Sequence, residues 1–421
     1  MSQTKIEVHS EIDPLQRVLV HRPDKGTARI SPKYAEELLF DDIVYLPRMQ
    51  EEHDVFVEVL EAFLGEGNVL EMETLLQEAL SHDEEAKKEM LEMIVSDEEL
   101  PSSVKELLYS LSAEALTQVL ITGYYEPEDY FLFDPIPNFI FTRDIAFVVN
   151  DHLVITKAAK EARSRENFLT RFIIWAHPIF QNLQKENKVV NLNKVDLFPR
   201  SKKGEPVSLE GGDAMLLHPD YLLIGASERT TPHAIRSLAQ ALFEKNVVKN
   251  VVQVNIPNDR SFMHLDTIFT QINTRDFVCY KPIIVDGMSS NLDVFRHDGS
   301  TDTYLSVKSF IEAEICPDAR FLLSGNGESP YQEREQWTDG CNLVALRPGV
   351  AVTYDRNPRT ELSFKEAGYR VVHAYDLLKA FKDGIILPSE VKNTIITLPS
   401  SELSRARGGS HCMTCPIERG G

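Results

Sequence analysis

Short apolar runs that come in pairs dominate the chain after residue 123. Each pair begins with polar or acidic residues, continues as an apolar run, turns at polar residues or a proline, and ends as a second apolar run. Runs of this length, separated by turn residues, are typical of two antiparallel strands. The pattern occurs at residues 141–155, 210–224, 264–279 and 337–354, and residues 15–20 provide a strand for a fifth unit.

Helical patterns lie between these strand pairs. The clearest begins at Thr231, a residue type that caps helix N-termini, and continues with Pro232 at the first helical position. Strand pairs that alternate with helices about five times predict an α/β fold with radial repetition around one axis. The polar residues at the starts of equivalent strands are then expected to meet in one central site.

The stretch from residue 72 to residue 123 has a different pattern. Its apolar residues recur with the helical period, its β-branched residues become rare, and Asp, Glu and Lys fill the other positions. We therefore expect a small helical insertion at 72–123, with a solvated charged face and no chemistry. Residues 1–71 and 124–421 would together form the α/β catalytic domain.

Composition restricts the possible partners. The 421 residues carry a formal net charge of −21, with a pI near 5.0, which argues against binding to nucleic acid or to an anionic membrane. No apolar signal core begins the chain, and no run of about 18 apolar residues occurs. Five cysteines are too few for a disulfide framework. We expect a soluble cytoplasmic protein.

Ionisable residues gather at the starts of the repeated strands. They are Asp144, Glu210, Asp213, His264 and Asp266, although Asp213 is equally compatible with a turn or capping role. Several carboxylates around one imidazole suit a cationic substrate, because paired carboxylates can hold a planar guanidinium through charge-assisted hydrogen bonds. A histidine in such a site can transfer protons.

A possible nucleophile follows in residues 407–416, where two glycines precede Ser410, His411 and Cys412. Glycine lets the backbone and a substrate approach closely, and Arg405, Arg407 and His411 would favour the thiolate. Three alternatives remain from the residues alone. Cys412 may be an inert buried cysteine, it may form a redox pair with Cys415, or the two may be half of a zinc site, although no second ligand pair has the spacing for zinc.

Several motifs together resemble the arginine deiminase family of guanidino-modifying enzymes. They lie in the family's order and extend over nearly the whole chain: Leu39–Asp42, Phe141–Asp144, Glu210–Asp213, Ser227–Thr230, His264–Thr267, Asp355–Asn357 and Gly408–Pro416. The resemblance implies a five-bladed α/β propeller, in which ββαβ units surround a pseudo-fivefold axis, with an inserted small helical bundle. It also implies hydrolysis of L-arginine to citrulline and ammonia without a metal or an organic cofactor.

The resemblance assigns roles to the central residues. Cys412 would attack the guanidinium carbon while Asp144 and Asp266 hold the guanidinium nitrogens. His264 would protonate the departing ammonia, leaving a covalent amidino-thioether, and would then deprotonate the water that releases citrulline. Glu210 would orient His264. Because acids surround both groups, we expect raised pKa values for Cys412 and His264 and a thiolate that forms mainly when cationic substrate arrives.

The amino-acid end of the substrate needs partners of its own. The resemblance places three arginines there, together with an amide and an aromatic ring: Arg163, Arg229, Arg407, Asn138 and Phe141. Simpler structural roles are a solvated helix face for Arg163 and a turn position for Asn138. Since agmatine has no carboxylate, these arginines would distinguish it from arginine.

Two departures from the family pattern leave other activities open. Extra residues lie between Val371 and Leu398, and Ala406 replaces a glycine of the usual Arg-Gly-Arg-Gly-Gly sequence. The alternatives are a deiminase or amidinotransferase that acts on another guanidine, and a non-catalytic or redox-switch protein on the same fold. Members of the family are often oligomeric, so a homo-oligomer is expected here.

Overall fold

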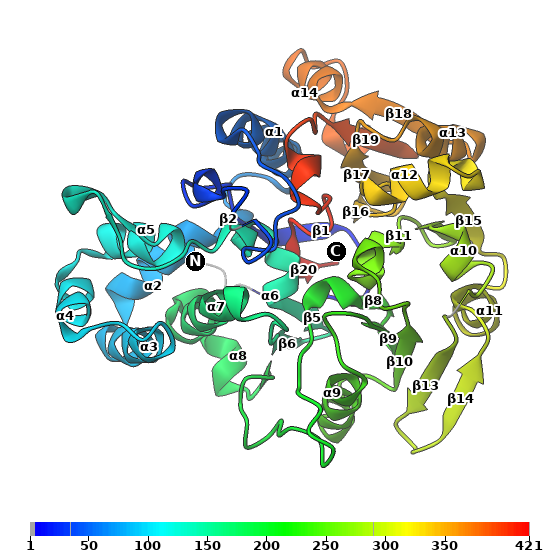
Figure 1. Cartoon of the computed structure of the whole chain (residues 1–421). Coiled ribbons are helices and arrows are strands. Elements are labelled where there is room, and N and C mark those ends of the chain that lie inside the picture. The colour runs from blue at the N-terminus through cyan, green and yellow to red at the C-terminus, as the bar shows by residue number, and fades with distance from the viewer. Residues whose placement is uncertain (1–4, 34, 289, 421) are drawn as a thin grey trace.

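The computed structural model describes residues 5–33, 35–288 and 290–420. Its strands form a mixed α/β fold in which five sheets of three or more strands follow one another around the middle of the molecule (Figure 1). Each of these sheets contains a strand that is antiparallel to one neighbour and parallel to another. No strand pairing within the described residues joins the sheets into one closed sheet.

Four sheets share one construction, in which a hairpin is followed by a crossover to a parallel strand. In the first, β5 (Ala146–Val149) and β6 (His152–Ile155) form the hairpin, and the chain crosses through α7 (Ser164–Ala176) and α8 (Gln181–Lys185) to β7 (Val189–Asn191). Apolar residues fill both strands of the hairpin because both faces are buried.

The second sheet repeats this order and then extends it. The hairpin is β8 (Ala214–His218) with β9 (Tyr221–Ala226), and α9 (Pro232–Glu244) leads to β10 (Asn250–Asn255). Thr231 accepts a hydrogen bond from the Ala234 backbone N–H, so the predicted N-cap is confirmed. Two further antiparallel strands, β13 (Leu292–Arg296) and β14 (Thr301–Tyr304), extend the sheet beyond β10.

The third and fourth sheets complete the repeat. The third contains β11 (Phe269–Gln271), β12 (Asp276–Cys279) and β15 (Arg320–Leu323), with α10 (Lys281–Ile284), α11 (Val307–Phe310) and the β13–β14 hairpin between β12 and β15. The short helix α12 (Tyr331–Trp337) then leads to the fourth sheet. That sheet has the order β16 (Val344–Arg347), β17 (Val350–Tyr354), β19 (Thr394–Leu398) and β18 (Arg370–His373).

The stretch that we expected to carry extra residues is part of the fourth sheet. After β17 the chain forms α13 (Pro358–Glu366), β18 and α14 (Ala374–Lys382), and it returns as β19 between β17 and β18. All five residues of β19 are buried. These residues therefore form the interior of the sheet that directly precedes the Cys412 segment.

The fifth sheet joins the two ends of the described chain. The strand β1 (Leu15–Val20) pairs in parallel with β2 (Val69–Glu71) and antiparallel with β20 (Cys415–Arg419). The helix α1 (Leu46–Leu64) connects β1 to β2 and buries an apolar face that includes Val55, Phe56 and Val59. Because β20 begins three residues after Cys412, this pairing fixes the segment that carries the thiol.

Four helices form the segment after β2: α2 (Met72–His82), α3 (Glu84–Asp97), α4 (Ser102–Ser110) and α5 (Ala113–Thr122). Asp83 and Ser112 cap α3 and α5 by accepting backbone N–H groups at their first turns. The apolar faces of these four helices share one core with α7 and with β5 and β6, so the helices pack directly on the first sheet. The hairpin of β3 (Tyr124–Tyr125) and β4 (Tyr130–Phe131) follows, then the single turn α6 (Thr142–Ile145). In the described part of the chain, no helix combines the length and apolarity needed to span a bilayer.

Candidate active site

Cys412 lies on the turn segment between β19 and β20, and its side chain is buried. The two preceding glycines are required by close neighbours. A Cβ on Gly408 would lie 2.3 Å from a ring carbon of Phe141, and a Cβ on Gly409 would lie 2.5 Å from the amide oxygen of Asn342. The glycines therefore allow the segment that carries the thiol to pack closely on Phe141 and Asn342, while the predicted close approach of a substrate stays a prediction.

Asn342, which directly precedes the fourth sheet, holds the nucleophile segment in place. Its Oδ1 accepts hydrogen bonds from the backbone N–H groups of His411 and Cys412, over 3.0 and 3.2 Å. Its Nδ2 donates to Sγ of Cys412 over 3.1 Å and to the carbonyl oxygen of Asp266 over 3.1 Å. One amide thus connects the thiol, its backbone and the neighbouring carboxylate residue.

Asp266 lies on the other side of the thiol. Cys412 Sγ donates to its Oδ2 over 3.3 Å, and Nδ1 of His411 lies 2.9 Å from the same oxygen. The second nitrogen of His411 lies 3.3 Å from Glu11. The other oxygen of Asp266, Oδ1, is buried and has no hydrogen-bond partner among the described residues. A buried carboxylate oxygen without a donor is the partner that a guanidinium N–H would satisfy.

His264 contacts two carboxylates. Its Nε2 lies 3.0 Å from Oε2 of Glu210, as predicted for an orienting contact, and its Nδ1 lies 3.7 Å from Oδ1 of Asp144. Burial lowers the pKa of His264, but Asp144 and Glu210 outweigh burial and raise it to about 10. Burial raises the pKa of Glu210, but the positive charges of Arg163, His264 and Arg229 outweigh burial and hold this pKa well below its ordinary value. His264 therefore carries a proton at neutral pH.

The pKa of the Cys412 thiol is raised well above its ordinary value. Burial is the largest cause, and the negative charges of Asp266, Asp144 and Asp339 add to it. The expectation that neighbouring cations favour the thiolate is wrong. Arg405 forms ion pairs with Asp42 and Glu402 at the surface, and His411 is turned toward Asp266 and Glu11. The expectation that the acids raise both pKa values is confirmed in direction.

Arg163 lies among the carboxylates. Its Nη1 is 2.6 Å from Oδ2 of Asp144 and 3.3 Å from Oε2 of Glu210, and its other nitrogens contact Glu166 over 2.7 and 2.9 Å. Its Nη2 also donates to the carbonyl oxygen of Asn138 over 3.3 Å. Arg163 is therefore no solvated helix-face residue. Its guanidinium is hydrogen-bonded to Asp144, a carboxylate that was expected to hold the guanidinium of the substrate.

Four further residues were expected at the amino-acid end of the substrate: Arg407, Arg229, Asn138 and Phe141. Arg407 has left-handed backbone, with φ of 62°, and its guanidinium stacks 3.2 Å from the ring centre of Trp337. Arg229 is buried with its Nη1 3.9 Å from Glu210, and its Nε has no hydrogen-bond partner in the described structure. The amide of Asn138 donates to the carbonyl oxygen of Leu38, and Phe141 packs on Gly408.

A cavity of about 30 Å³ connects these groups. Nine of the ten expected site residues line it: Asn138, Phe141, Asp144, Arg163, Glu210, Arg229, His264, Arg407 and Cys412. Asp266 contacts it through Cys412. A volume of this size holds only one or two water molecules. A molecule as large as arginine therefore needs more room than this cavity offers, and some of its lining side chains must shift on binding.

Asp144, Glu210 and His264 offer ligand atoms close enough to one another to hold a metal ion. The position between the two carboxylates is occupied instead by the cationic Arg163, which is buried. A metal would compete with that guanidinium and with the proton on His264. The donor set thus fits a guanidinium better than a metal, and the predicted independence from metal ions stays a prediction.

Asp213 has a structural role. Its Oδ1 accepts from the Leu265 backbone N–H over 2.9 Å and its Oδ2 accepts from the Ser227 hydroxyl over 2.6 Å. Burial raises its pKa to about 7 in spite of these bonds. Asp213 thereby connects the segment at Glu210 to the segment at His264, which accords with the turn or capping role considered from the sequence.

Sequence reasoning missed three residues of the network. Asn342 had a signal, because it precedes a repeated strand at the place where Glu210 and Asp213 precede theirs. Glu166 follows Arg163 by three positions at the start of α7, a spacing that brings side chains together on a helix. Glu11 has no comparable signal, since it reaches His411 from the irregular N-terminal segment.

Comparisons with known proteins agree with this geometry. The family model described as arginine deiminase matches residues 36–126 and 110–419. Arginine deiminases of Bacillus cereus (strain ATCC 10987 / NRS 248) and Listeria monocytogenes serovar 1/2a are 36% and 34% identical, with 98% of this chain and of each relative covered. The arginine deiminase of Limosilactobacillus reuteri is 35% identical, with 99% and 98% covered.

Solved structures show the same mixed α/β fold. The product-bound N-terminal domain of ArgZ, a cyanobacterial arginine dihydrolase, aligns with a TM-score of 0.51 at 16% identity and covers 97% of this chain and 99% of its own. The amidinotransferase SxtG of Microseira wollei aligns with a TM-score of 0.53 at 14% identity, with 99% and 98% covered. At such low identity these structures establish the fold alone. With the full-length sequence matches, the chain belongs to the arginine deiminase family.

Proposed function

We propose that this protein is an arginine deiminase, which hydrolyses L-arginine to L-citrulline and ammonia. One observation carries the proposal. The Cys412 thiol lies 3.3 Å from Asp266, whose second oxygen is buried and has no hydrogen-bond partner among the described residues. The thiol lines a cavity with Asp144 and the His264–Glu210 pair. A planar cation between Asp144 and Asp266 would present its carbon to the sulfur. Curated relatives with this name match over the full chain.

The first half of the reaction forms a bond from sulfur to carbon. The Cys412 thiolate attacks the guanidinium carbon, and the negative charges of Asp144 and Asp266 hold the nitrogens while the carbon becomes tetrahedral. His264, protonated in the empty site, donates its proton to the leaving nitrogen. The carbon–nitrogen bond breaks, ammonia leaves, and an amidino-thioether remains on Cys412. A solved ArgZ structure contains a covalently bound reaction intermediate.

The second half returns the enzyme to its starting state. His264, now neutral, takes a proton from a water molecule as that water attacks the same carbon. The carbon–sulfur bond then breaks, the electron pair returns to Cys412, and the new hydroxyl group gives its proton to the sulfur as citrulline is released. Glu210 keeps His264 in place through both proton transfers, over 3.0 Å. The water molecule thus supplies one proton to His264 and one to Cys412, which restores the starting state.

Substrate charge provides the activation of the thiol. In the empty site, burial and the acids raise the pKa of Cys412, so the thiol is protonated. A guanidinium that pairs with Asp266 and Asp144 cancels two of the three charges that oppose the thiolate, and the Asn342 amide already donates to Sγ. The thiol therefore loses its proton to solvent when the cationic substrate binds, and the nucleophile is formed.

Substrate binding requires Arg163 to share or release Asp144. Its guanidinium lies on the carboxylate that the substrate needs, and Glu166 remains as a second partner when that contact breaks. We propose that Arg163 then joins Arg229 and Arg407 at the substrate carboxylate, with Asn138 and Phe141 lining the same end. All five residues line the cavity, which supports this assignment.

The architecture that carries this site is also part of the proposal. Five sheets, four of which share one construction, follow one another around the middle of the molecule and support a five-bladed α/β propeller (Figure 1). The division into a catalytic domain (1–71 and 124–421) and a helical insertion (72–123) stays a prediction, as do the homo-oligomer, the cytoplasmic location and the absence of nucleic-acid and membrane partners.

The first experiment measures citrulline and ammonia release from L-arginine, with agmatine assayed beside it. Turnover of arginine alone supports both the deiminase and the arginine cluster at the carboxylate. Equal turnover of agmatine retains the chemistry and contradicts the carboxylate site. Cys412→Ala is expected to abolish turnover, and Asp266→Ala to lower kcat/KM by at least about a hundredfold, since it removes a charged substrate contact and a neighbour of the thiol. Substantial turnover by Cys412→Ala would disprove the mechanism.

A further inference from the structure

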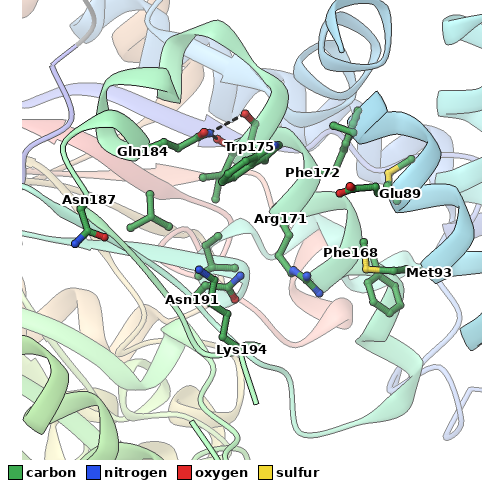
Figure 2. Close-up of a pocket in the computed structure, with 15 residues that line it drawn as sticks. Glu89, Met93, Phe168, Arg171, Phe172, Trp175, Gln184, Asn187, Asn191 and Lys194 are labelled. Carbon is green, nitrogen blue, oxygen red and sulfur yellow. Dashed lines mark hydrogen bonds between the residues drawn. The ribbon is translucent and has the colours of Figure 1, made fainter. Parts of the chain in front are cut away.

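A second cavity, of about 400 Å³, lies between α3 of the helical segment and the helix α7, away from the residues that line the cavity at Cys412 (Figure 2). Cavities of several hundred Å³ are of the size that holds small molecules. Side chains from both helices and from the β7 region line it. A molecule bound there would contact the helical segment and the first sheet together.

Most of the wall is apolar. Met90 and Met93 extend from α3, and Phe168, Phe172 and Trp175 extend from α7. The indole of Trp175 is 61% exposed although it borders the cavity. Methionine and aromatic side chains adapt well to an apolar group of unspecified shape. The wall therefore suits the apolar part of a ligand.

The side chain of Arg171 extends into this apolar space. The guanidinium of Arg171 points between Phe168 and Asn191 in Figure 2. Arg171 makes no hydrogen bond or ion pair with any residue that the structure describes, and its Nε is buried without a partner. Burial alone lowers its pKa. By contrast, Arg163 and Arg165 beside the start of the same helix are paired with Glu166 and Glu98.

The polar residues at the border complete the pattern. Lys194 adds a second cation, and Asn187 and Asn191 offer amide donors. Glu89 is the one carboxylate of the lining, and it forms no ion pair with Arg171 in the described structure. In a chain with a net charge of −21, a half-buried arginine at an apolar cavity, with no ion pair among the described residues, is available to pair with an anion.

We propose that this cavity binds a small amphipathic carboxylate. The ligand's carboxylate pairs with Arg171, with Lys194 beside it, and its hydrocarbon part lies against Met93, Phe168 and Phe172. A guanidinium forms two parallel hydrogen bonds to a carboxylate, which explains the choice of anion over a neutral polar group. The binding site is separate from the proposed deiminase site and does not depend on its chemistry.

Isothermal titration of the full-length protein with octanoate tests the proposal, with octanol as a neutral probe of the same chain length. We expect saturable binding of octanoate, and weaker binding of octanol by at least about tenfold, because the alcohol leaves Arg171 unpaired. Trp175 provides a local signal. In a Trp337→Phe background it is the single tryptophan of the chain, and its fluorescence is expected to change in parallel with the heat.

Variants locate the binding. Arg171→Met is expected to lose octanoate affinity at least about tenfold, whereas Arg171→Lys retains most of it because the charge is kept. Glu89→Gln, the matched change on the opposite wall, is expected to keep or improve the affinity. Thermal melting of each variant confirms that it is folded. Equal affinity of Arg171→Met, equal affinity for octanol, or no saturable binding of octanoate would each overturn the proposal, as would occlusion of the cavity by a second copy of the chain.

Discussion

The side-chain amide of Asn342 donates a hydrogen bond to Sγ of Cys412, over 3.1 Å, and its oxygen accepts the backbone N–H of the same cysteine. This makes Asn342 the uncharged donor to the sulfur in a site whose carboxylates all oppose a negative charge there. A donor to sulfur stabilises the thiolate more than the thiol, because hydrogen bonds to charged groups are the stronger ones.

Replacing Asn342 by alanine is therefore expected to raise the pKa of Cys412 further and to lower kcat by about tenfold or more, since a hydrogen bond to a charged group contributes roughly 1.5–3 kcal/mol. The pH–rate profile at saturating arginine measures both effects. Asn250→Ala, which removes another buried asparagine far from the thiol, is the matched control and should leave the profile unchanged. An unshifted profile for Asn342→Ala would show that the amide has only a packing role.

Arg163 has two possible roles, and substitution separates them. If Arg163 binds the substrate carboxylate, Arg163→Met lowers kcat/KM for arginine by at least about tenfold and leaves the low activity toward agmatine unchanged. If it serves only to fill the site at Asp144 before substrate binds, both substrates respond equally. We expect the first result. The ratio of the two kcat/KM values is the measurement, and an unchanged ratio would contradict the assigned role.

The raised pKa of His264 predicts how stability depends on pH. Asp144 and Glu210 outweigh burial and raise this pKa from 6.5 to about 10, so the folded protein holds the proton more tightly than the unfolded chain. The resulting stabilisation is complete below pH 6.5 and is lost as pH rises through about 10. The Tm of His264→Gln should therefore fall less steeply than that of the wild type over this range. The exposed His218→Gln is the control, and it should keep the wild-type slope.

Gly408 is expected to tolerate no side chain. A Cβ there would lie 2.3 Å from the buried Phe141 ring, so either this ring or the segment that carries Cys412 must shift. A displacement of about 1 Å at a reacting group can lower the rate about a hundredfold, and we expect a loss of kcat/KM of that order for Gly408→Ala. Gly204→Ala provides the comparison, because Gly204 has φ of +85° and open space around it. That variant should lose some stability and keep its kcat/KM.

Removal of metal ions is expected to leave the activity unchanged. The three residues that could hold an ion are Asp144, Glu210 and His264. The two carboxylates already pair with the guanidinium of Arg163, and His264 carries a proton. Dialysis against a chelator, followed by the citrulline assay with and without added divalent ions, is the measurement. Loss of activity that an added ion restores would contradict the cofactor-free mechanism.

The sequence predicted where the ionisable residues meet, because position within a repeated unit determines it. Asp144, Glu210, His264 and Asp266 each precede the first strand of a sheet, and equivalent strand starts converge. Asn342 occupies the same place in the fourth sheet and could have been included by that rule. Its neutral side chain gave no chemical reason to select it.

The sequence could not predict which residue each ionisable group would contact. Arg405 and His411 lie near Cys412 in the chain, yet they pair with Asp42 and with Asp266 and Glu11 rather than with the thiol. Arg163, which was expected at the substrate carboxylate, forms an ion pair with Asp144 that the sequence did not indicate. Ion pairs depend on atomic distances across several loops, and these distances follow from the packing of the whole fold rather than from local pattern.

The pairing of β1 with β20 affects when the site forms during synthesis and folding. Arg17 and Glu418, which are 401 positions apart in the chain, form an ion pair across these two strands. A ribosome delivers β1 long before β20, and contacts of such long range form slowly because a large loop must close first. The first three sheets, from β5 to β15, are complete in the nascent chain before Cys412 is synthesised. The thiol therefore reaches the site only after most of the residues around it have been made.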